Sequence, residues 1–354
     1  MLSDVMEAAV LTAFGGPDVL HLREDVPVPK VPAGQVLVRM TAASVNNTDI
    51  WTREGAYGLP GNPDAKAGWR GSVEFPRIQG ADMVGRISHV GEGVDASLIG
   101  KRVLVDPAFY ETAKDDAHPI GLLGSEKDGG FAEYVVVDAT RAHDVSDSPL
   151  SDEQLACLPT AYGTALGMLE RAGVGHGETV FVTGASGGVG LALVQLAAAR
   201  GASVIAMSKS AKAKEVTAAG ATYVIDRDSD SIGENILDAA PDGLDVMADV
   251  VGGEMVTSMS PLLKEGGRWV IAGAVGGSVV SLDLRRLYLH NRRLIGSSMH
   301  TPAHFRELVE EANAGRINPR VAETFPLSRI HEAQYFFKQQ QHVGKVVILP
   351  SSRN

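Results

Sequence analysis

A polar run at residues 46–49, Asn-Asn-Thr-Asp, follows an apolar segment and could direct polar side chains into an active-site cleft. The amide of Asn46 and the hydroxyls of Thr48 and Tyr57 could donate hydrogen bonds to an oxygen on which negative charge builds. Tyr57 could also supply a proton, because an unperturbed tyrosine is protonated at neutral pH. A surface turn is the alternative, since Asn and Asp are ordinary turn residues.

A glycine-rich turn has the features of a dinucleotide phosphate site. It lies in "TVFVTGASGGVGLALVQLAAARG", where a short apolar run leads through the turn into a helix-like segment. Gly187 and Gly188 would let the backbone approach a pyrophosphate at the helix N-terminus, and Gly190 would allow the helix to pack closely on the strand. The first glycine of the usual GxGxxG pattern is replaced by Ala185, with Gly184 just before it. The residues expected at the cofactor are Gly184, Ala185, Ser186, Gly187, Gly188, Val189 and Gly190.

The next apolar run indicates which dinucleotide is bound. It ends in "IAMSKSAKAK" and carries no acid before Glu215. An NAD site usually places Asp or Glu about 20 residues beyond the first glycine, against the ribose 2′-hydroxyl. The hydroxyl and ammonium groups of Ser208, Lys209 and Lys212 suit a 2′-phosphate instead, although a solvated lysine face at a helix start is the alternative. The sequence therefore favours NADP(H), with Arg227 as a further candidate at the adenosine end.

Other segments could contact the cofactor from later in the chain. The turns "DVVGG" and "AGAVGG" each follow an apolar run, and ligands approach α/β sheets at such strand ends. Val250, Ala274 and Val275 are the candidates in these turns, and each turn could equally be an ordinary connection. Lys345 could reach the cofactor from the C-terminal segment, with a surface lysine as the alternative.

The elements that must hold these residues fall into two groups. At 354 residues, two domains are the default expectation. The first part contains short strand-like runs between glycine turns, which are typical of a barrel-like β domain. Six later apolar runs alternate with helical patterns, as in a doubly wound parallel sheet. We therefore expect an α/β chain with a β-rich domain at residues 1–153, completed by 301–354, and a Rossmann domain at 154–300.

Composition excludes several classes of protein. The formal charge of −11 argues against a nucleic-acid partner, because phosphate binding needs a basic surface. There is no apolar run of 18 residues, so no membrane span is expected. The N-terminus lacks the basic and apolar blocks of a signal peptide, which favours the cytoplasm. Cys157 is the single cysteine, so neither an internal disulfide nor a cysteine-based zinc site is expected.

The order of these parts resembles the medium-chain dehydrogenase/reductase superfamily over nearly the whole chain. The resemblance is carried by "GADMVGRISHVGEGV", "GGFAEYVVV", the glycine turn and the returning C-terminal segment. It implies a GroES-like catalytic domain joined to a Rossmann domain, with the active site in the cleft between them. Because relatives are commonly dimers or tetramers, it also implies a homodimer.

The zinc alcohol dehydrogenases of this superfamily carry metal ligands at three positions that can be compared. Their Cys, the His of their Gly-His-Glu triplet and their third ligand correspond to Asn46, Ala81 and, approximately, Thr160. Amide, methyl and hydroxyl groups make no zinc site, so no catalytic zinc is expected. Thr160 is instead expected to contact the cofactor.

The Asn-x-x-Asp pattern with a following Tyr resembles the zinc-free quinone oxidoreductase branch, which is related to ζ-crystallin. This implies that Asn46 and Tyr57 face the nicotinamide and the substrate, while Asp49 pins the loop by hydrogen bonds. The expected function is NADPH-dependent reduction of a quinone or an α,β-unsaturated carbonyl. The alternatives are an alcohol dehydrogenase-type enzyme and an NADPH-binding protein of low turnover.

Two segments are longer than the resemblance requires. "GLPGNPDAKAGWRGSVEFPRIQ" holds Trp69 and Arg70 and follows the polar run. It could form a lid or one wall of the substrate pocket, or it could be a surface loop. "YETAKDDAHPIGLLGSEKDGGFAEY" could be the remnant of a lost metal lobe.

Overall fold

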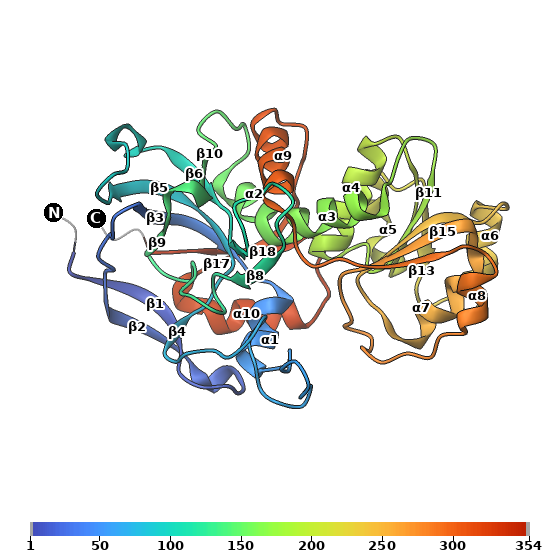
Figure 1. Ribbon diagram of the computed structural model, residues 1–354, viewed down its shortest axis with the longest axis horizontal. Helices are drawn as coiled ribbons and strands as arrows, with labels where there is room; N and C mark the ends of the chain where they lie inside the picture. The colour runs from blue at the N-terminus through green and yellow to red at the C-terminus, as the bar shows by residue number, and fades with distance from the viewer. Residues whose placement is uncertain (1–2, 352–354) are drawn as a thin grey trace. The chain divides into compact units, whose positions relative to one another are not determined.

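The computed structural model describes residues 3–351 and divides the chain into two compact units (Figure 1). Of the described residues, 3–160 and 301–351 belong to unit 1, and 161–300 belong to unit 2. Within residues 3–351, no helix is both long enough and apolar enough to cross a membrane.

Unit 1 is built on a sheet with the strand order β10-β6-β5-β3-β18-β17, and β9 also pairs with β3. Alternate residues of its strands, such as Val36 and Val38, are fully buried in one apolar core with Phe131. The strands of this sheet are β3 (Gln35–Ser44), β5 (Asp82–Val90), β6 (Arg102–Val105), β9 (Tyr134–Asp138), β10 (Ala142–Asp144), β17 (Val321–Pro326) and β18 (Lys345–Leu349).

Smaller elements complete unit 1. A three-stranded sheet has the order β2-β1-β4, and β7 pairs with β8. These strands are β1 (Val5–Leu11), β2 (Leu20–Pro27), β4 (Arg77–Ile78), β7 (Ala108–Tyr110) and β8 (Pro119–Leu122). The helices are α1 (Asn47–Glu54), α2 (Asp152–Ala156), α9 (Pro302–Asn313) and α10 (Ile330–Lys338).

The C-terminal strand β18 returns to unit 1, as the sequence predicts. It pairs antiparallel with β3, with Val347 opposite Ser44. This register brings the start of β18 to the end of β3, where the polar run 46–49 begins.

Unit 2 contains a parallel six-stranded sheet with the order β13-β12-β11-β14-β15-β16, and the predicted doubly wound sheet is therefore confirmed. Chain order reverses between β11 and β14, where ligands bind in such sheets. The strands are β11 (Thr179–Val182), β12 (Ser203–Ser208), β13 (Tyr223–Asp226), β14 (Leu244–Asp249), β15 (Leu263–Ile271) and β16 (Arg293–Gly296). The helices are α3 (Gly163–Ala172), α4 (Gly188–Ala199), α5 (Ala213–Ala218), α6 (Ile232–Ala239), α7 (Gly253–Met259) and α8 (Leu284–Tyr288).

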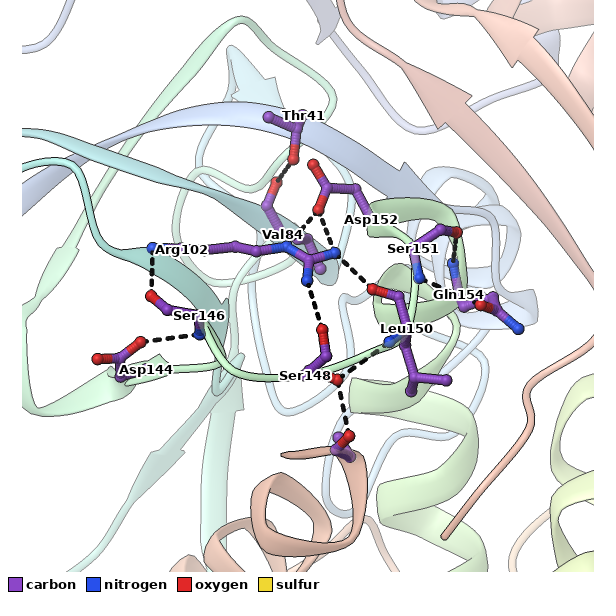
Figure 2. Close-up of polar contacts among 11 residues, drawn as sticks. Thr41, Val84, Arg102, Asp144, Ser146, Ser148, Leu150, Ser151, Asp152 and Gln154 are labelled. Carbon is purple, nitrogen blue, oxygen red and sulfur yellow. Dashed lines mark hydrogen bonds and ion pairs between the residues drawn. The ribbon is translucent and has the colours of Figure 1, made fainter. Parts of the chain in front are cut away.

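The side chain of Arg102 on β6 binds residues 148–152, the segment that leads into α2 (Figure 2). Its guanidinium donates to Asp152 Oδ1 at 2.5 Å and to the carbonyl oxygens of Leu150 at 2.8 Å and Ser148 at 3.3 Å. The Ser148 hydroxyl in turn donates to the carbonyl oxygen of Ala312 in α9 at 2.7 Å. The largely buried guanidinium of Arg102 therefore holds the segment that leads into α2. Through Ser148, the same segment is also bonded to α9.

We expect Arg102→Met to lower the free energy of unfolding by about 3 kcal/mol, because it leaves the Asp152 carboxylate without its cation and two carbonyls without donors. For a unit of this size, that corresponds to a fall in Tm of about 6–12 °C, which differential scanning calorimetry would measure. Arg23→Met breaks the Arg23–Asp25 pair, whose side chains are 51% and 71% exposed, and should leave Tm unchanged. Equal Tm shifts in the two variants would contradict the role given to Arg102.

Candidate active site

The polar run 46–49 lies where β3 ends and α1 begins. Asn46 is the N-cap residue of α1 in extended backbone conformation, and its backbone N–H donates to Asp49 Oδ2 at 2.8 Å. Asp49 is 2% exposed, and burial raises its pKa to about 7, with the nearby Asp82 adding to the shift. The carboxyl group therefore pins the first turn of α1, as expected for Asp49.

The amide of Asn46 is engaged at both ends inside unit 1. Its Nδ2 donates to Asp82 Oδ2 at 2.9 Å and to the Ser44 carbonyl oxygen at 3.4 Å, and its Oδ1 accepts from the Lys345 ammonium. Both N–H groups of the amide already have acceptors in this conformation. The structure therefore supports a role for Asn46 in positioning the loop, and the predicted donation to substrate stays a prediction.

Lys345 is a buried partner of this loop. Its ammonium also donates to the Val45 carbonyl oxygen at 2.9 Å and lies 3.1 Å from Asp82 Oδ2, and the residue is 4% exposed. The ammonium thus donates two hydrogen bonds, to Val45 and Asn46, and forms an ion pair with Asp82 inside unit 1. These contacts were not predicted from the sequence. The predicted contact of Lys345 with the cofactor stays a prediction.

The three positions that hold metal in zinc relatives meet around Asp82. Asp82 accepts from Asn46 and, at Oδ1, from the backbone N–H of Thr160 at 2.7 Å, and Ala81 precedes it in the chain. In residues 3–351, no three His, Cys, Asp or Glu side chains are grouped so as to hold a metal ion. Thr160 lies in a π-helical turn, Leu158–Tyr162, and its buried hydroxyl oxygen has no hydrogen-bond partner among residues 3–351. Its predicted contact with the cofactor also stays a prediction.

Thr48 and Tyr57 form a pair of hydroxyls at the partly exposed side of the loop. The Tyr57 hydroxyl donates to Thr48 Oγ1 at 3.2 Å. The rings of Tyr57 and Trp51 pack edge to face, with their centroids 5.6 Å apart. Burial raises the pKa of Tyr57 well above its ordinary value, so the phenol is protonated at neutral pH. In this conformation the phenol hydrogen is engaged by Thr48, so a bound carbonyl oxygen would take the proton from Tyr57 by displacing this 3.2 Å bond.

The glycine turn of unit 2 connects β11 to α4 in a conformation that requires glycine. Gly184 has a φ of 57°, in the left-handed region. A Cβ on Gly190 would lie 2.2 Å from the Gly184 carbonyl oxygen, so a side chain there would force the turn open. A Cβ on Gly187 would meet only that same oxygen, at 3.5 Å. The turn is thus closely packed on the helix side and roomy at the N-terminus of α4, as a pyrophosphate site requires.

A pocket of about 300 Å³ lies beside this turn and gathers six of the predicted cofactor residues. The predicted residues are Gly184, Ser186, Ser208, Lys209, Lys212 and Arg227, and the others are Met207, Asp228, Val251 and Met255. Burial lowers the pKa of Lys212, and the nearby Arg227 and Lys209 lower it further. Asp228 is paired with Arg227 at 3.4 Å. Three cations and one carboxylate thus line the pocket, and the net positive charge favours binding of an anion.

The remaining predicted residues of unit 2 lie around the same turn or beyond it. Ala185, Gly188 and Val189 belong to the turn and the first residues of α4. Val250 lies against the turn, since a Cβ on Gly184 would be 3.1 Å from Val250 Cγ2. Ala274 and Val275 follow β15 and do not line the 300 Å³ pocket.

Val251 and Met255 line this pocket and are absent from the sequence-based set. Val251 directly follows the predicted Val250, so extending that turn by one residue would have found it. Met255 lies in α7, where nothing in the local sequence marks it as a ligand contact.

A larger cavity of about 460 Å³ lies in unit 1, beside β9 and β4. Arg77, Phe109, Lys127 and Arg141 are among its lining residues. None of the predicted site residues lines it, so size alone does not mark the site of the chemistry.

Comparison with known families matches both units. Residues 32–147 match the alcohol dehydrogenase GroES-like domain, and residues 188–314 match the family described as zinc-binding dehydrogenase. The GroES-like part of the predicted fold is therefore confirmed.

Similar proteins cover almost the entire chain. Quinone oxidoreductase of Rattus norvegicus is 28% identical, with 98% of each chain covered. The NADPH-dependent alkenal/one oxidoreductase of Arabidopsis thaliana is 30% identical over 98% of this chain and 80% of its own length. An NAD-dependent alcohol dehydrogenase of Sulfolobus acidocaldarius is 31% identical over 97% and 99%.

A crystal structure of a Sinorhizobium meliloti 1021 protein superposes with a TM-score of 0.95 at 44% identity, covering 99% of this chain and 98% of that one. Members of the medium-chain dehydrogenase/reductase superfamily bind nicotinamide cofactors. The chain is an oxidoreductase of the medium-chain dehydrogenase/reductase superfamily and belongs to its quinone oxidoreductase-like branch.

Proposed function

We propose that this oxidoreductase uses NADPH to reduce a quinone or an α,β-unsaturated carbonyl compound. The observation that carries the choice of cofactor is the pocket beside the glycine turn, where Lys209, Lys212 and Arg227 gather with the Ser208 and Ser186 hydroxyls. Phosphate is the ligand that such a group of cations and hydroxyls recognises. Bound NADPH would supply the hydride.

The donor set around Asp82 does not fit a catalytic zinc ion. Ala81 offers no donor atom, the Asn46 amide is held by Asp82 and Lys345, and the Lys345 ammonium already places a cation in this cluster. The proposal therefore assigns carbonyl polarisation to hydroxyl groups. An acceptor that is already electrophilic, such as a quinone or an enone, needs no stronger activation.

Thr48 and Tyr57 are the groups proposed to act on the acceptor. When hydride adds to a carbon of the conjugated system, electrons move to the carbonyl oxygen, and hydroxyl donors stabilise the charge there. Tyr57 would transfer its proton to that oxygen and regain one from solvent. The raised pKa of Tyr57 keeps the proton on the phenol until negative charge develops nearby.

We expect the wild-type protein to oxidise NADPH in the presence of 1,4-benzoquinone or but-3-en-2-one, and Tyr57→Phe to lower kcat about 100-fold because the proton donor is lost. Steady-state absorbance of NADPH would measure both. Tyr335→Phe is a matched control, since Tyr335 is 68% exposed on α10, and it should keep wild-type kcat.

Three results would contradict the proposal in different ways. Unchanged turnover in Tyr57→Phe would remove that residue from the chemistry. NADPH binding without turnover of either acceptor class would favour a low-turnover binding protein. Oxidation of alcohols with NAD⁺ by a protein carrying one tightly held zinc per chain would favour the alcohol dehydrogenase alternative.

A further inference from the structure

The long segment after Tyr57 folds back onto the end of α1. Ala56 and Ala67 form a parallel bridge, and the Ala67 N–H donates to the Gly55 carbonyl oxygen at 3.1 Å. The two bridged segments run in the same direction. Tyr57 therefore follows Ala56 by one residue, and Trp69 follows Ala67 by two residues, on the same side of the bridge. The ten residues between the bridged pair therefore form a closed loop. The Glu126 carboxylate, which accepts from the Arg70 N–H in the chain beyond this loop, is also close enough to Tyr57 to help raise the pKa of its phenol.

A second segment of unit 1 holds the backbone at Trp69. Ser125 Oγ accepts from the Trp69 N–H at 2.9 Å, and Glu126 Oε1 accepts from the Arg70 N–H at 2.9 Å. Glu126 is itself fixed, because its Oε2 accepts from the Leu122 N–H at 2.7 Å. We call Ser125 and Glu126 the clasp. Ser125 and Glu126 lie in the second of the two segments that are longer than the resemblance requires. Their side chains thus bind the backbone of the first such segment at Trp69 and Arg70.

The clasp also fixes the position of the Trp69 backbone. A Cβ on Gly68 would lie 2.6 Å from Ser125 Oγ, so the chain could approach Ser125 this closely only with glycine there. The Trp69 side chain is partly exposed, and the Arg70 guanidinium lies 4.7 Å from its ring centroid. The Arg70 guanidinium therefore covers one face of the indole.

We propose that Trp69 determines acceptor specificity by stacking against a planar conjugated ring, with Ser125 and Glu126 as the residues that position it. This rests on the proposed function and narrows its substrate class to fused-ring quinones and aryl-conjugated enones over small acyclic enones. A rigid indole held at the backbone offers a flat apolar surface to a second ring at little entropic cost. The adjacent guanidinium adds a cation beside an acceptor whose oxygens become electron-rich on reduction.

Equilibrium binding tests this proposal without turnover. The probe is 2,3-dimethyl-1,4-naphthoquinone, whose methyl groups block thiol addition at the ring, titrated calorimetrically in the absence of NADPH. We expect Trp69→Ala to raise its Kd at least 10-fold, Trp69→Phe to raise it less than threefold, and Ser125→Ala to give an intermediate rise. Tyr335→Ala removes an exposed aromatic from α10 and should leave Kd unchanged.

Equal Kd values for wild type and Trp69→Ala would overturn the proposal, and so would a wild-type protein that does not bind the quinone. In turnover assays, Trp69→Ala should raise KM for the naphthoquinone about 10-fold while KM for but-3-en-2-one stays within twofold. A general structural defect would raise both, and that result would also overturn the proposal. Quinone binding that is lost in Trp69→Ala, in a protein that never oxidises NADPH, would refute the proposed function and support the stacking site.

Discussion

Replacing both Lys212 and Arg227 with alanine is expected to raise the Kd for NADPH about 100-fold or more and the Kd for NADH less than threefold. The two side chains line the pocket beside the glycine turn and would face the 2′-phosphate, which NADH lacks. A hydrogen bond to a charged group contributes about 1.5–3 kcal/mol, so the loss of two corresponds to a factor of at least about 100. Removing Lys212 and Arg227 also removes the repulsion between their charges, which offsets part of the lost affinity for NADPH.

Fluorescence titration of the reduced cofactors would measure this change in preference. Lys214→Ala is the matched control, because Lys214 is an exposed lysine two residues further along that does not line the pocket. It should leave both Kd values unchanged. Equal weakening of NADPH and NADH in the double variant would show that the two cations bind the shared part of the cofactor, and the 2′-phosphate assignment would fail.

Much of unit 2 can be predicted from sequence because its signals are local. A strand buried on both faces of a parallel sheet is mostly apolar, and β11, β12 and β14 are short runs in which apolar residues predominate, although β14 includes Asp245 and Asp249. The glycine turn follows the same logic, since Gly184 needs positive φ and Gly190 has no room for a Cβ. Six of the pocket residues follow from this turn and from the strand ends beside it.

The polar cluster of unit 1 could not be predicted in the same way because it depends on register between distant strands. The sequence places β18 in the first domain, but the pairing of Val347 with Ser44 is what brings Lys345 to Asn46, 299 residues earlier in the chain. A shift of one residue would turn the lysine to the other face of the sheet. The bonds from the clasp to Trp69 and Arg70 likewise join two irregular segments with no periodic pattern.

Loss of the Lys345 ammonium should have the largest effect on stability. We expect Lys345→Met to lower the free energy of unfolding by about 3–5 kcal/mol, because it leaves the fully buried Asp82 carboxylate without the cation that lies 3.1 Å away. Ser44, Asn46 and the Thr160 N–H still donate to Asp82, but they carry no net charge. Methionine keeps most of the volume of the buried side chain, so little of the loss comes from a cavity. Thermal unfolding would measure the change.

A double-mutant cycle separates this pair from general damage to the loop. Asp82→Asn removes the buried charge, so Lys345→Met should cost about 1–3 kcal/mol less in the Asp82→Asn background than in the wild type. Lys338→Met breaks the exposed pair with Glu54, whose side chain is 39% exposed, and should leave Tm unchanged. Additive losses in the cycle would mean that Lys345 stabilises the loop through its bonds to Val45 and Asn46 alone. Non-additive losses would identify the Asp82–Lys345 pair as the charge balance that lets the polar end of β3 remain buried beside Thr48 and Tyr57.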